Sequence, residues 1–270
     1  MLRDDDFARI AALVHKISGI VLAQNKRPLV QSRLSRRLRA LGMAGFDVYA
    51  DFVSRPENVQ EQSELLTAVT TNVTSFFREQ HHFDTLIQSA LPALAARAQA
   101  GGRVRIWSAG CSSGEEPYSI AACVLAVLPS AATLDLRILA TDIDTTMVAR
   151  AAAGLFPAEA AAGLPSDHRR RLFTSSPQAG MVQVSDQAKA LVTCKALNLQ
   201  GDWPMRGPFD VIFCRNVVIY FDKSTQERLW QRFADTLVPG GHLMIGHSER
   251  VSGPALSLFS AEGITTYRRR

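Results

Sequence analysis

Cysteine is scarce in this sequence and is not arranged for metal binding or for a disulfide framework. The four cysteines are Cys111, Cys123, Cys194 and Cys214, and they form neither a C-x-x-C pair nor a zinc-ligand spacing. The adjacent His81 and His82 also lack a ligand partner at a suitable spacing, so we interpret them as surface or satisfied core residues. We therefore expect buried thiols in a reducing compartment and no metal site.

Long apolar segments are absent as well. No uninterrupted apolar run reaches the roughly 20 residues that a membrane-spanning helix needs. The N-terminal stretch Met-Leu-Arg-Asp-Asp-Asp-Phe lacks the apolar core of a signal peptide. With 47% apolar and 20% charged residues, the chain has the composition of a soluble globular protein, and we expect it in the cytoplasm.

The glycine pattern of a dinucleotide site is missing from the turn where it would be expected. Residues Val104–Ile120 predict a strand, a turn of small residues between Gly110 and Gly114, and a helix. A dinucleotide site needs Gly-x-Gly-x-x-Gly and a free helix N-terminus, but Glu115 and Glu116 lie there and would repel a phosphate. Two carboxylates suit a ligand with an ammonium or sulfonium group, and S-adenosylmethionine carries both. Acidic residues at a helix start also complement the helix dipole without any ligand, and this alternative stays open.

Positive charge, in contrast, is abundant. The net charge of +5 and the pI of about 9.3 suit an acidic partner, either nucleic acid or a negatively charged protein surface. The helix expected over Asn25–Leu41 gathers arginines away from its apolar stripe, with no acidic residue between Lys26 and Ala44. We interpret this face as a docking surface for an acidic partner, with a solvated basic face as the alternative. Its residues are Arg33, Arg36 and Arg37, with Arg39 beside them.

The periodicity of the first quarter of the chain predicts a small all-helical domain over residues 1–72. Its helices are expected at Asp4–Ile17, Asn25–Leu41, Asp47–Val53 and Val59–Val69. Residues 73–85 then read as a linker, with a helix from Ser75. Asn72, Thr74 and Arg78 in this stretch are either a plain linker with a helix cap or part of a site.

The remainder, residues 86–270, predicts an α/β fold in which parallel strands alternate with helices. Helices are expected at Leu86–Ala100 and Thr225–Leu237, and strands at Val104–Ser108, Leu134–Ala140, Pro208–Phe213 and His242–Gly246, with a closing pair of strands over Ser257–Tyr267. Residues 155–195, approximately, break this alternation and predict an inserted subdomain with short strands near Met181–Val184 and Leu191–Thr193.

Polar side chains follow two of these strands. Asp142 comes at the end of the second strand, 28 positions after Gly114, and Arg215 and Asn216 follow the Pro208–Phe213 strand. Ligands of open α/β sheets bind at the carboxyl edge, where an acidic residue can accept hydrogen bonds from both ribose hydroxyls. A carboxylate after a strand can otherwise cap the next helix, which is the role that we expect for Asp144.

Several separated motifs together resemble the CheR family of chemoreceptor glutamate O-methyltransferases. They are Thr-Thr-Asn-Val-Thr-Ser-Phe-Phe-Arg-Glu at 70–79, Trp-Ser-Ala-Gly-Cys-Ser-Ser-Gly-Glu-Glu-Pro-Tyr-Ser at 107–119, Thr-Asp-Ile-Asp at 141–144, Phe-Cys-Arg-Asn at 213–216, Ile-Tyr-Phe at 219–221 and Gly-His-Ser-Glu at 246–249. The resemblance covers nearly the whole chain. It implies a helical N-terminal domain joined to a class I S-adenosylmethionine-dependent methyltransferase sheet, Rossmann-like, with a small inserted β-subdomain.

The resemblance also implies roles for individual residues on the donor side of the site. Asn72, Thr74 and Arg78 would contact S-adenosylmethionine, with Arg78 a partner for the methionine carboxylate. Glu116 would face the methionine amino end, although Glu115 is an alternative that the sequence leaves open. Asp142 would bind the ribose.

Further residues are implied at the adenine and methyl ends of the cofactor. Asn198 and Leu199 would lie beside the adenine, and Arg215 and Asn216 would complete the pocket near the methyl group. Arg215 and Tyr220 are the residues expected to orient the substrate carboxylate. Arg33, Arg36 and Arg37 would correspond to the family's docking surface for the acidic methylation helices of receptors.

The activity implied is transfer of a methyl group to glutamate side chains of membrane chemoreceptors, the methyl-accepting chemotaxis proteins, leaving S-adenosylhomocysteine. The protein would meet the membrane only through these cytoplasmic helices and would bind no nucleic acid. Two alternatives remain at the level of sequence. One is a nucleic-acid methyltransferase, although the Arg-Asn-Val-Val-Ile-Tyr stretch at 215–220 replaces the Asn/Asp-Pro-Pro-aromatic motif of amino-group methyltransferases. The other is a sensor that binds S-adenosylmethionine without turnover.

Overall fold

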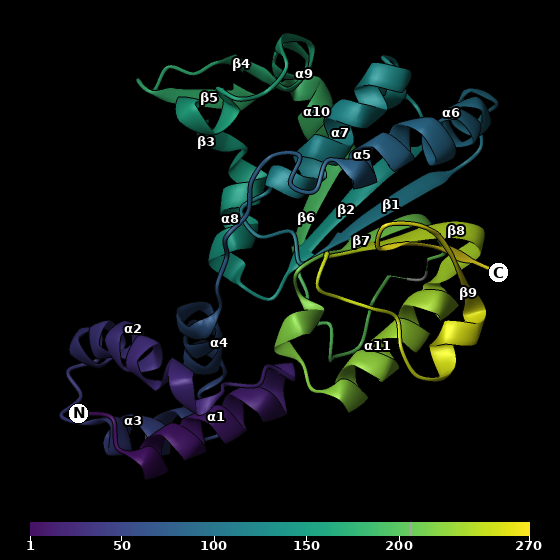
Figure 1. Cartoon of the computed structure of the whole chain (residues 1–270). Helices are drawn as coiled ribbons and strands as arrows, with labels where there is room; N and C mark the ends of the chain where they lie inside the picture. Colours follow the sequence, from purple (N-terminus) through teal and green to yellow (C-terminus); the bar gives the residue numbers. More distant parts are fainter. Residues whose placement is uncertain (206) are drawn as a thin grey trace.

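The structure is a computed structural model and describes residues 1–205 and 207–270. Its first part is a bundle of four helices, seen in purple at the lower left of Figure 1: α1 (Asp4–Ser18), α2 (Arg27–Ala40), α3 (Phe46–Val53) and α4 (Val59–Val69), with a short 3-10 helix η1 (Gln24–Lys26) ahead of α2. All four lie within two residues of the predicted bounds. Each buries an apolar stripe in one shared core that includes Phe7, Leu34, Tyr49 and Leu65.

The segment after α4 differs from the prediction. A helix was expected from Ser75, but residues 70–80 are irregular and the first helix, α5 (His81–Thr85), begins six residues later. Phe77 and Glu79 adopt left-handed backbone angles, with φ of 52° and 57°, which end any helix at these positions. Tertiary packing explains the departure, because Phe76 and Phe77 are buried and the Phe77 N–H donates to Ser119 Oγ at 2.9 Å.

The single helix expected over Leu86–Ala100 is also divided. A π-helical turn, η2 (Leu86–Ala90), joins α5 to α6 (Leu91–Gln99), so that the helical stretch begins at His81 rather than at Leu86. Phe83, which the prediction left in the linker, is completely buried and stacks on Phe213 with ring centroids 5.7 Å apart. The last part of the predicted linker therefore packs as part of the sheet domain.

The centre of the molecule is a seven-stranded sheet in the order β6-β2-β1-β7-β8-β10-β9. Neighbouring strands from β6 to β8 are parallel, and β10 is antiparallel to both of its neighbours. The strands are β1 (Val104–Ala109), β2 (Leu136–Asp142), β6 (Val192–Ala196), β7 (Phe209–Cys214), β8 (Leu237–Ile245), β9 (Phe259–Gly263) and β10 (Thr266–Arg269). The order reverses between β1 and β7, which places the ligand crevice of such a sheet at the carboxyl ends of these strands.

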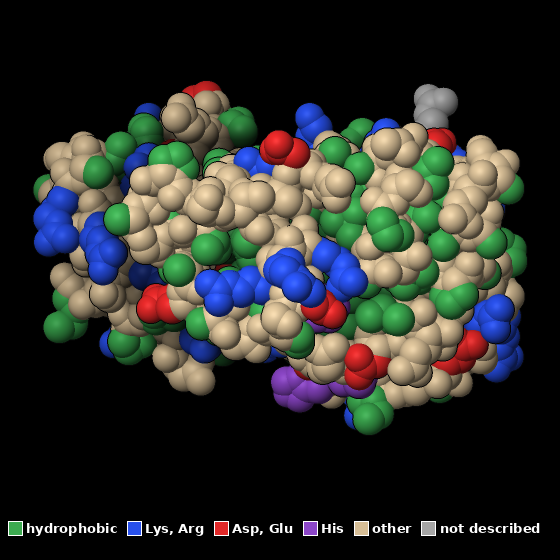
Figure 2. Space-filling view, turned by 90° about the horizontal axis from the view of Figure 1, so that it is seen from above, with side chains coloured by type: hydrophobic (Ala, Val, Ile, Leu, Met, Phe, Trp, Pro, Cys, Tyr) green, Lys and Arg blue, Asp and Glu red, His purple; other side chains and the backbone are tan. Residues whose placement is uncertain are grey.

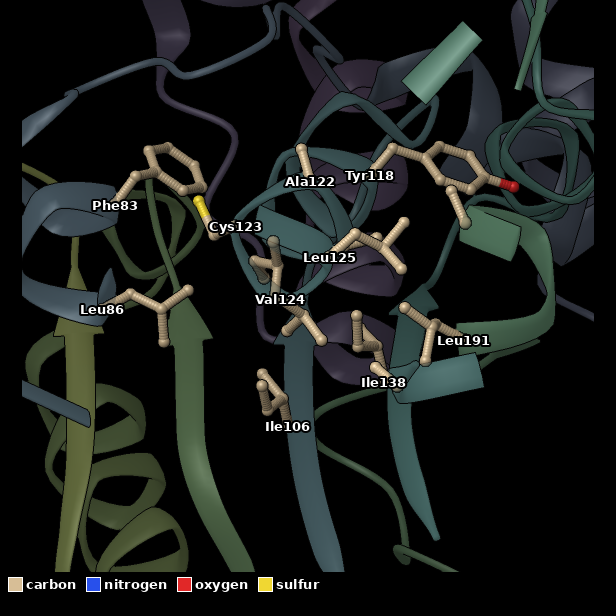
Figure 3. Close-up of a cluster of buried hydrophobic side chains, with 14 of the residues drawn as sticks. Phe83, Leu86, Ile106, Tyr118, Ala122, Cys123, Val124, Leu125, Ile138 and Leu191 are labelled. Carbon is tan, nitrogen blue, oxygen red and sulfur yellow. The ribbon is translucent and has the colours of Figure 1, made fainter. Parts of the chain in front are cut away.

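Helices cover both faces of this sheet (Figure 1). On one face, α5, α6, α7 (Glu115–Val127) and α10 (Asp186–Leu191) bury a core with Ile106 and Ile138, which Figure 3 shows between α7 and the strands. On the other face, α11 (Lys223–Thr236) packs Trp230 and Phe233 into the core that holds Trp107. Ile106 and Trp107 alternate in this way because successive strand residues point to opposite faces. Helix α8 (Thr145–Ala153) joins β2 to the inserted subdomain, and short 3-10 turns, η3 (Ala131–Thr133), η5 (Val218–Tyr220) and η6 (Pro254–Leu258), complete the fold.

The inserted subdomain is smaller than predicted. Its three antiparallel strands are β3 (Leu155–Pro157), β4 (Phe173–Ser175) and β5 (Met181–Val184) in the order β3-β5-β4, with η4 (Ala158–Ala161) and α9 (Ser166–Leu172) between β3 and β4. Residues Leu191–Thr193 were assigned to this insertion, but β6 pairs in parallel with β2 and belongs to the central sheet. Phe76 of the linker anchors the subdomain by edge-on contacts with Phe156 and Phe173, at 5.0 and 5.3 Å between ring centroids.

Within the described residues, no helix has both the length and the apolar character that crossing a membrane requires. Figure 2 shows the molecule from the side of the inserted subdomain, where Lys and Arg side chains gather in the middle and at the left edge. All four cysteines are free thiols; Cys111, Cys123 and Cys214 are buried as predicted, whereas Cys194 is only half-buried.

Candidate active site

The main cleft lies between the helical bundle and the carboxyl ends of β1, β2 and β7. Its empty volume is about 1250 Å³, a figure that includes the solvent-filled mouth. The sheet domain contributes polar and apolar residues to the walls, and the linker runs along one side. The cleft is lined by every residue predicted to bind the cofactor: Asn72, Thr74, Arg78, Glu116, Asp142, Asn198, Leu199, Arg215 and Asn216, together with Tyr220.

The turn between β1 and α7 places Glu116 in the cleft. Gly114 is the N-cap residue of α7 and has φ of 107°, and a Cβ there would come within 2.9 Å of the Ala151 backbone, so only glycine fits. Glu116 Oε1 accepts a hydrogen bond from Ser108 Oγ at 2.7 Å, and burial raises the pKa of Glu116. Glu115 instead accepts from Ser113 Oγ at 2.6 Å, and among the described residues only Glu116 of the pair lines the cleft.

Asp142 lies at the carboxyl end of β2 and is 8% exposed. Its two oxygens accept backbone hydrogen bonds from Ser112, at 2.8 Å, and from Asp144, at 2.9 Å. Burial raises the pKa of Asp142, and these two N–H donors oppose the shift. Each carboxylate oxygen has a second lone pair, so the group can still accept hydroxyl donors from a ligand in the cleft.

Asp144 caps α8 as predicted and also joins the two domains. Its Oδ1 accepts from the N–H groups of Thr146 and Met147, which is the N-cap pattern. From the N-terminal side, Thr67 Oγ1 donates to the same oxygen at 3.1 Å, and Asn72 Nδ2 donates to Oδ2 at 2.8 Å. The Asn72 amide thus positions the start of the linker against the sheet domain.

Arg215 is the most enclosed cation of the site, with 2% of its side chain exposed. Its Nη1 donates to Glu116 Oε2 at 3.1 Å, and its Nη2 lies 3.4 Å from Glu79 Oε2 and donates to the Arg78 carbonyl. The guanidinium also lies over the ring of Phe83, 5.6 Å from its centroid. Arg215 therefore pairs with two carboxylates, one of which, Glu79, the sequence had left without a role.

Glu249 is a second residue whose role the sequence did not reveal. It is 4% exposed, and its carboxylate accepts backbone N–H groups from the loop after β7 and from the end of β8. The donors are Asn216 at 3.1 Å, Val217 at 2.9 Å, Val218 at 2.7 Å, Ile219 at 3.3 Å and Gly246 at 2.6 Å. The Gly-His-Ser-Glu motif was the available signal, but nothing in it indicates which loop the carboxylate holds.

The helical bundle forms a wall of the cleft that the sequence did not predict. Ile20, Val21 and Leu22, between α1 and η1, line the cleft. They are fixed there because Val21 N donates to the Tyr220 carbonyl at 2.8 Å and Ile20 pairs with Phe221 as an antiparallel bridge. A ligand in the cleft therefore touches both domains.

Asn198 is occupied by contacts of its own. Its Nδ2 donates to the Ile17 carbonyl at 2.7 Å, and its Oδ1 accepts from the Gln200 N–H at 2.9 Å. The side chain therefore holds the end of α1 and its own turn, and a ligand beside it would meet the backbone and the buried Leu199.

The predicted docking surface on α2 is divided by the structure. Arg36 is exposed, whereas Arg37 forms hydrogen bonds of 2.6 to 3.0 Å with the buried Glu61 of α4 and lies 3.5 Å from Glu64. Arg33 donates to the carbonyls of Ala68 and Thr70 at the end of α4. The prediction of one exposed face was wrong for Arg33 and Arg37. Their partners lie on α4 and at its end, and the sequence of α2 alone does not reveal that α4 packs against it.

His81, His82 and Glu79 form a group of potential metal ligands, because each offers a ligand atom within 4.8 Å of the others. His82 is fully buried and its Nε2 lies 2.9 Å from Thr265 Oγ1; burial lowers its pKa to about 3, so the ring stays neutral. The Arg215 guanidinium lies 3.4 Å from the Glu79 carboxylate, and a fixed positive charge at this distance opposes binding of a metal cation by that carboxylate. The group is better described as part of the ionic network around Arg215.

The residues of the cleft fit S-adenosylmethionine. Carboxylates at Glu116 and Asp142 suit its cationic end and its ribose, and Arg78 suits its carboxylate. Apolar side chains of Ile143 and Val217 supply surfaces for a flat ring.

Comparison with known proteins agrees with this geometry. The model described as "CheR methyltransferase, SAM binding domain" matches residues 72–267, and the one described as "CheR methyltransferase, all-alpha domain" matches residues 5–70. The chain is 50% identical to a probable chemotaxis protein methyltransferase of Rhizobium etli, covering 95% of this chain and 96% of the relative.

Two relatives of lower identity also match over most of the chain. The chain is 40% identical to the chemotaxis protein methyltransferase of Salmonella typhimurium, over 98% of this chain and 90% of the relative, and 40% identical to that of Escherichia coli, over 93% and 86%. These matches span both domains and the whole cleft. The chain therefore belongs to the CheR methyltransferase family and is an S-adenosylmethionine-dependent methyltransferase of chemotaxis.

Proposed function

We propose that this enzyme methylates glutamate side chains in the cytoplasmic helices of chemoreceptors, forming γ-methyl esters. The observation that carries the proposal is the cleft at the carboxyl ends of β1, β2 and β7, in which acidic groups for a cationic donor and basic groups for an anionic acceptor both line the walls. The family to which the chain belongs supports the same substrate. We place the enzyme in the cytoplasm, where those helices are.

The residues are assigned to the donor by their chemistry. Arg78 would bind the methionine carboxylate, Glu116 the amino group and Asp142 the ribose hydroxyls. Asn72 and Thr74 would bound this part of the cleft from the linker. Arg78 is suited to its role because its Nη1 already donates to the Val73 carbonyl at 2.9 Å, which holds the guanidinium beside the cleft.

The remaining site residues are assigned to the adenine and to the reacting groups. Leu199 and the backbone of Asn198 would flank the adenine. Asn216 and Tyr220 belong to the loop that Glu249 holds, and Arg215, directly before this loop, also lines the cleft. The structure modifies one expectation here: since Arg215 already pairs with two carboxylates, we assign orientation of the substrate carboxylate mainly to Tyr220.

The chemistry needs little from the protein beyond alignment. The bound cofactor supplies a methyl group on a sulfonium, which an anionic oxygen displaces in line. A glutamate with an ordinary pKa near 4.3 is ionised at neutral pH, so no general base is needed. Holding the two reactants in attack geometry can account for about 7 to 11 kcal/mol of a barrier.

The mouth of the cleft suits an acidic, helical substrate. Lys26 and Arg78 line the cleft from the two domains, and Arg36 is exposed on the neighbouring helix α2. These cations would attract a carboxylate-rich helix at long range and be screened by salt.

The test is transfer of label from [methyl-³H]S-adenosylmethionine to membranes that contain chemoreceptors. We expect label on the receptor that mild base releases as methanol, since carboxyl esters hydrolyse under these conditions and N-methyl groups do not. A receptor whose methylated glutamates are replaced by alanine is the matched control and should take up no label.

The same assay separates the two alternatives. Base-stable label on DNA or RNA would indicate a nucleic-acid methyltransferase. Tight cofactor binding with no transfer to any receptor would indicate a sensor. Either result would contradict the proposed function.

A further inference from the structure

Glu79 is held in the site by polar contacts and by an unusual backbone conformation. Its backbone is left-handed, with φ of 57°, a conformation that costs a non-glycine residue free energy unless its surroundings impose it. Its side chain is 12% exposed and contacts the ends of two strands. Oε1 accepts from His247 Nδ1 at 3.1 Å and from Asn216 Nδ2 at 3.4 Å, and Oε2 faces Arg215 Nη2 at 3.4 Å.

These contacts place the Arg215 guanidinium between two carboxylates, Glu79 and Glu116. The three groups are more than four-fifths buried and have a combined formal charge of −1. Although burial alone would raise the pKa of Glu79, its hydrogen bond from His247 and the charge of Arg215 lower it to about 2. Glu79 is therefore ionised throughout the working range of pH, and Arg215 is never paired with Glu116 alone.

We propose that Glu79 is a positioning residue that shares Arg215 with Glu116, which keeps the Glu116 carboxylate available to the amino group of the cofactor and keeps the cluster net negative toward the sulfonium of the methyl donor. Without Glu79, one guanidinium faces one carboxylate, and the cluster becomes neutral. An Arg–carboxylate pair is then free to adopt the bidentate arrangement that neutralises the acid most completely. The inference rests on the proposed role of Glu116 at the methionine end of the cofactor.

The consequence is selective because donor and product differ by one charge. S-adenosylmethionine carries a sulfonium that S-adenosylhomocysteine lacks, while the methionine and adenosine parts are shared. A net negative cluster beside the cleft attracts the donor more than the product. Glu79 therefore contributes to the preference for donor over spent cofactor, which a merely structural residue would not.

The experiment compares the affinities of both molecules for Glu79→Gln and for unaltered protein by titration calorimetry. Gln has the same shape and keeps the acceptor for His247, so the change removes mainly the charge. We expect the affinity for S-adenosylmethionine to fall about tenfold and that for S-adenosylhomocysteine by less than about threefold. Calorimetry reports the fraction of competent protein separately, so partial misfolding lowers the stoichiometry for both molecules and leaves their ratio readable.

Two variants complete the test. Glu115→Gln removes the same charge at the position before Glu116. Since Glu115 pairs with Ser113 rather than with Arg215, this change should leave the ratio of the two affinities unchanged. Glu79→Asp retains the charge and should restore the ratio.

Equal losses for both molecules in Glu79→Gln, or a change as large in Glu115→Gln, would overturn the inference while leaving the proposed function intact. Failure of unaltered protein to bind either molecule would overturn the proposed function and this inference with it.

Discussion

The loop that carries Asn216 and Tyr220 depends on one buried carboxylate, and replacing it gives the sharpest test of the site. Glu249 accepts the N–H groups of Asn216 and Gly246 on Oε2 and those of Val217, Val218 and Ile219 on Oε1. Glu249→Gln keeps the size of the side chain. It replaces one acceptor oxygen by an NH₂ group, which can only donate.

The expected cost follows from counting the donors that lose their acceptor. Turned one way, the NH₂ faces the backbone N–H groups of Asn216 and Gly246; turned the other way, it faces those of Val217, Val218 and Ile219, so at least two donors lose their acceptor. Leaving a buried donor without a partner costs about 1 to 3 kcal/mol each, and the remaining bonds lose their charge assistance. We therefore expect Glu249→Gln to lower the free energy of unfolding by about 3 to 5 kcal/mol. We also expect methyl transfer to lose more in kcat than in KM, because Tyr220 is displaced.

Urea unfolding followed by circular dichroism measures the first quantity, and steady-state transfer to receptor measures the second. Glu57→Gln is the matched control, since Glu57 is exposed and undergoes the same change of charge. It should change stability by less than about 0.5 kcal/mol. If Glu249→Gln cost no more than this control, the Glu249 carboxylate would not be what holds the loop.

Three further changes test other parts of the structure. Asp142→Ala should weaken S-adenosylmethionine binding by about 2 kcal/mol, because charged hydrogen bonds to the ribose are lost; unchanged affinity in calorimetry would remove Asp142 from the site. Arg37→Ala leaves Glu61 buried without its partner and should lower the free energy of unfolding by about 3 kcal/mol, whereas Arg36→Ala should leave stability unchanged and slow receptor methylation at low salt; the reverse pattern would contradict the division of α2. His82 has a pKa of about 3 in the fold against about 6.5 when unfolded, so the unfolded chain binds more protons between these values; stability from this residue is complete well above pH 6.5 and is lost as pH falls, by about 2 kcal/mol between pH 6.5 and 4.5. The pH dependence of urea unfolding should therefore be less steep in His82→Gln than in unaltered protein, and identical curves would refute this.

Features set by local chemistry were predictable from the sequence. The four helices of the bundle follow from apolar periodicity, and the β1 turn follows from Gly114 with two acids after it. Asp144 was correctly predicted as the cap of α8, because an N-cap needs only a short polar side chain at the right position. The residues predicted to bind the cofactor all line one cleft, since strands of a parallel sheet bring their carboxyl ends to one edge.

Features set by distant partners were not predictable in this way. Residues 70–80 look like a helix start, but the burial of Phe76 and Phe77 decides their path. Arg37 looks exposed until Glu61, which is 24 residues away, comes to lie opposite it. Glu79 and Glu249 are ordinary acids in the sequence, and their roles depend on the fold bringing Arg215 and the loop after β7 beside them.

Asp144 forms hydrogen bonds with both domains, which limits the exchange of domains between related enzymes. One carboxylate both starts α8 and receives Thr67 and Asn72 from the other side of the domain boundary, while Ile17 and Val21 are tied to Asn198 and Tyr220. A chimaera that takes its first 70 residues from a relative must keep side chains that can form these contacts between the domains. Otherwise the two walls of the cleft will not pack together. A grafted helical bundle therefore has to restore these contacts before the exchanged protein can bind the methyl donor.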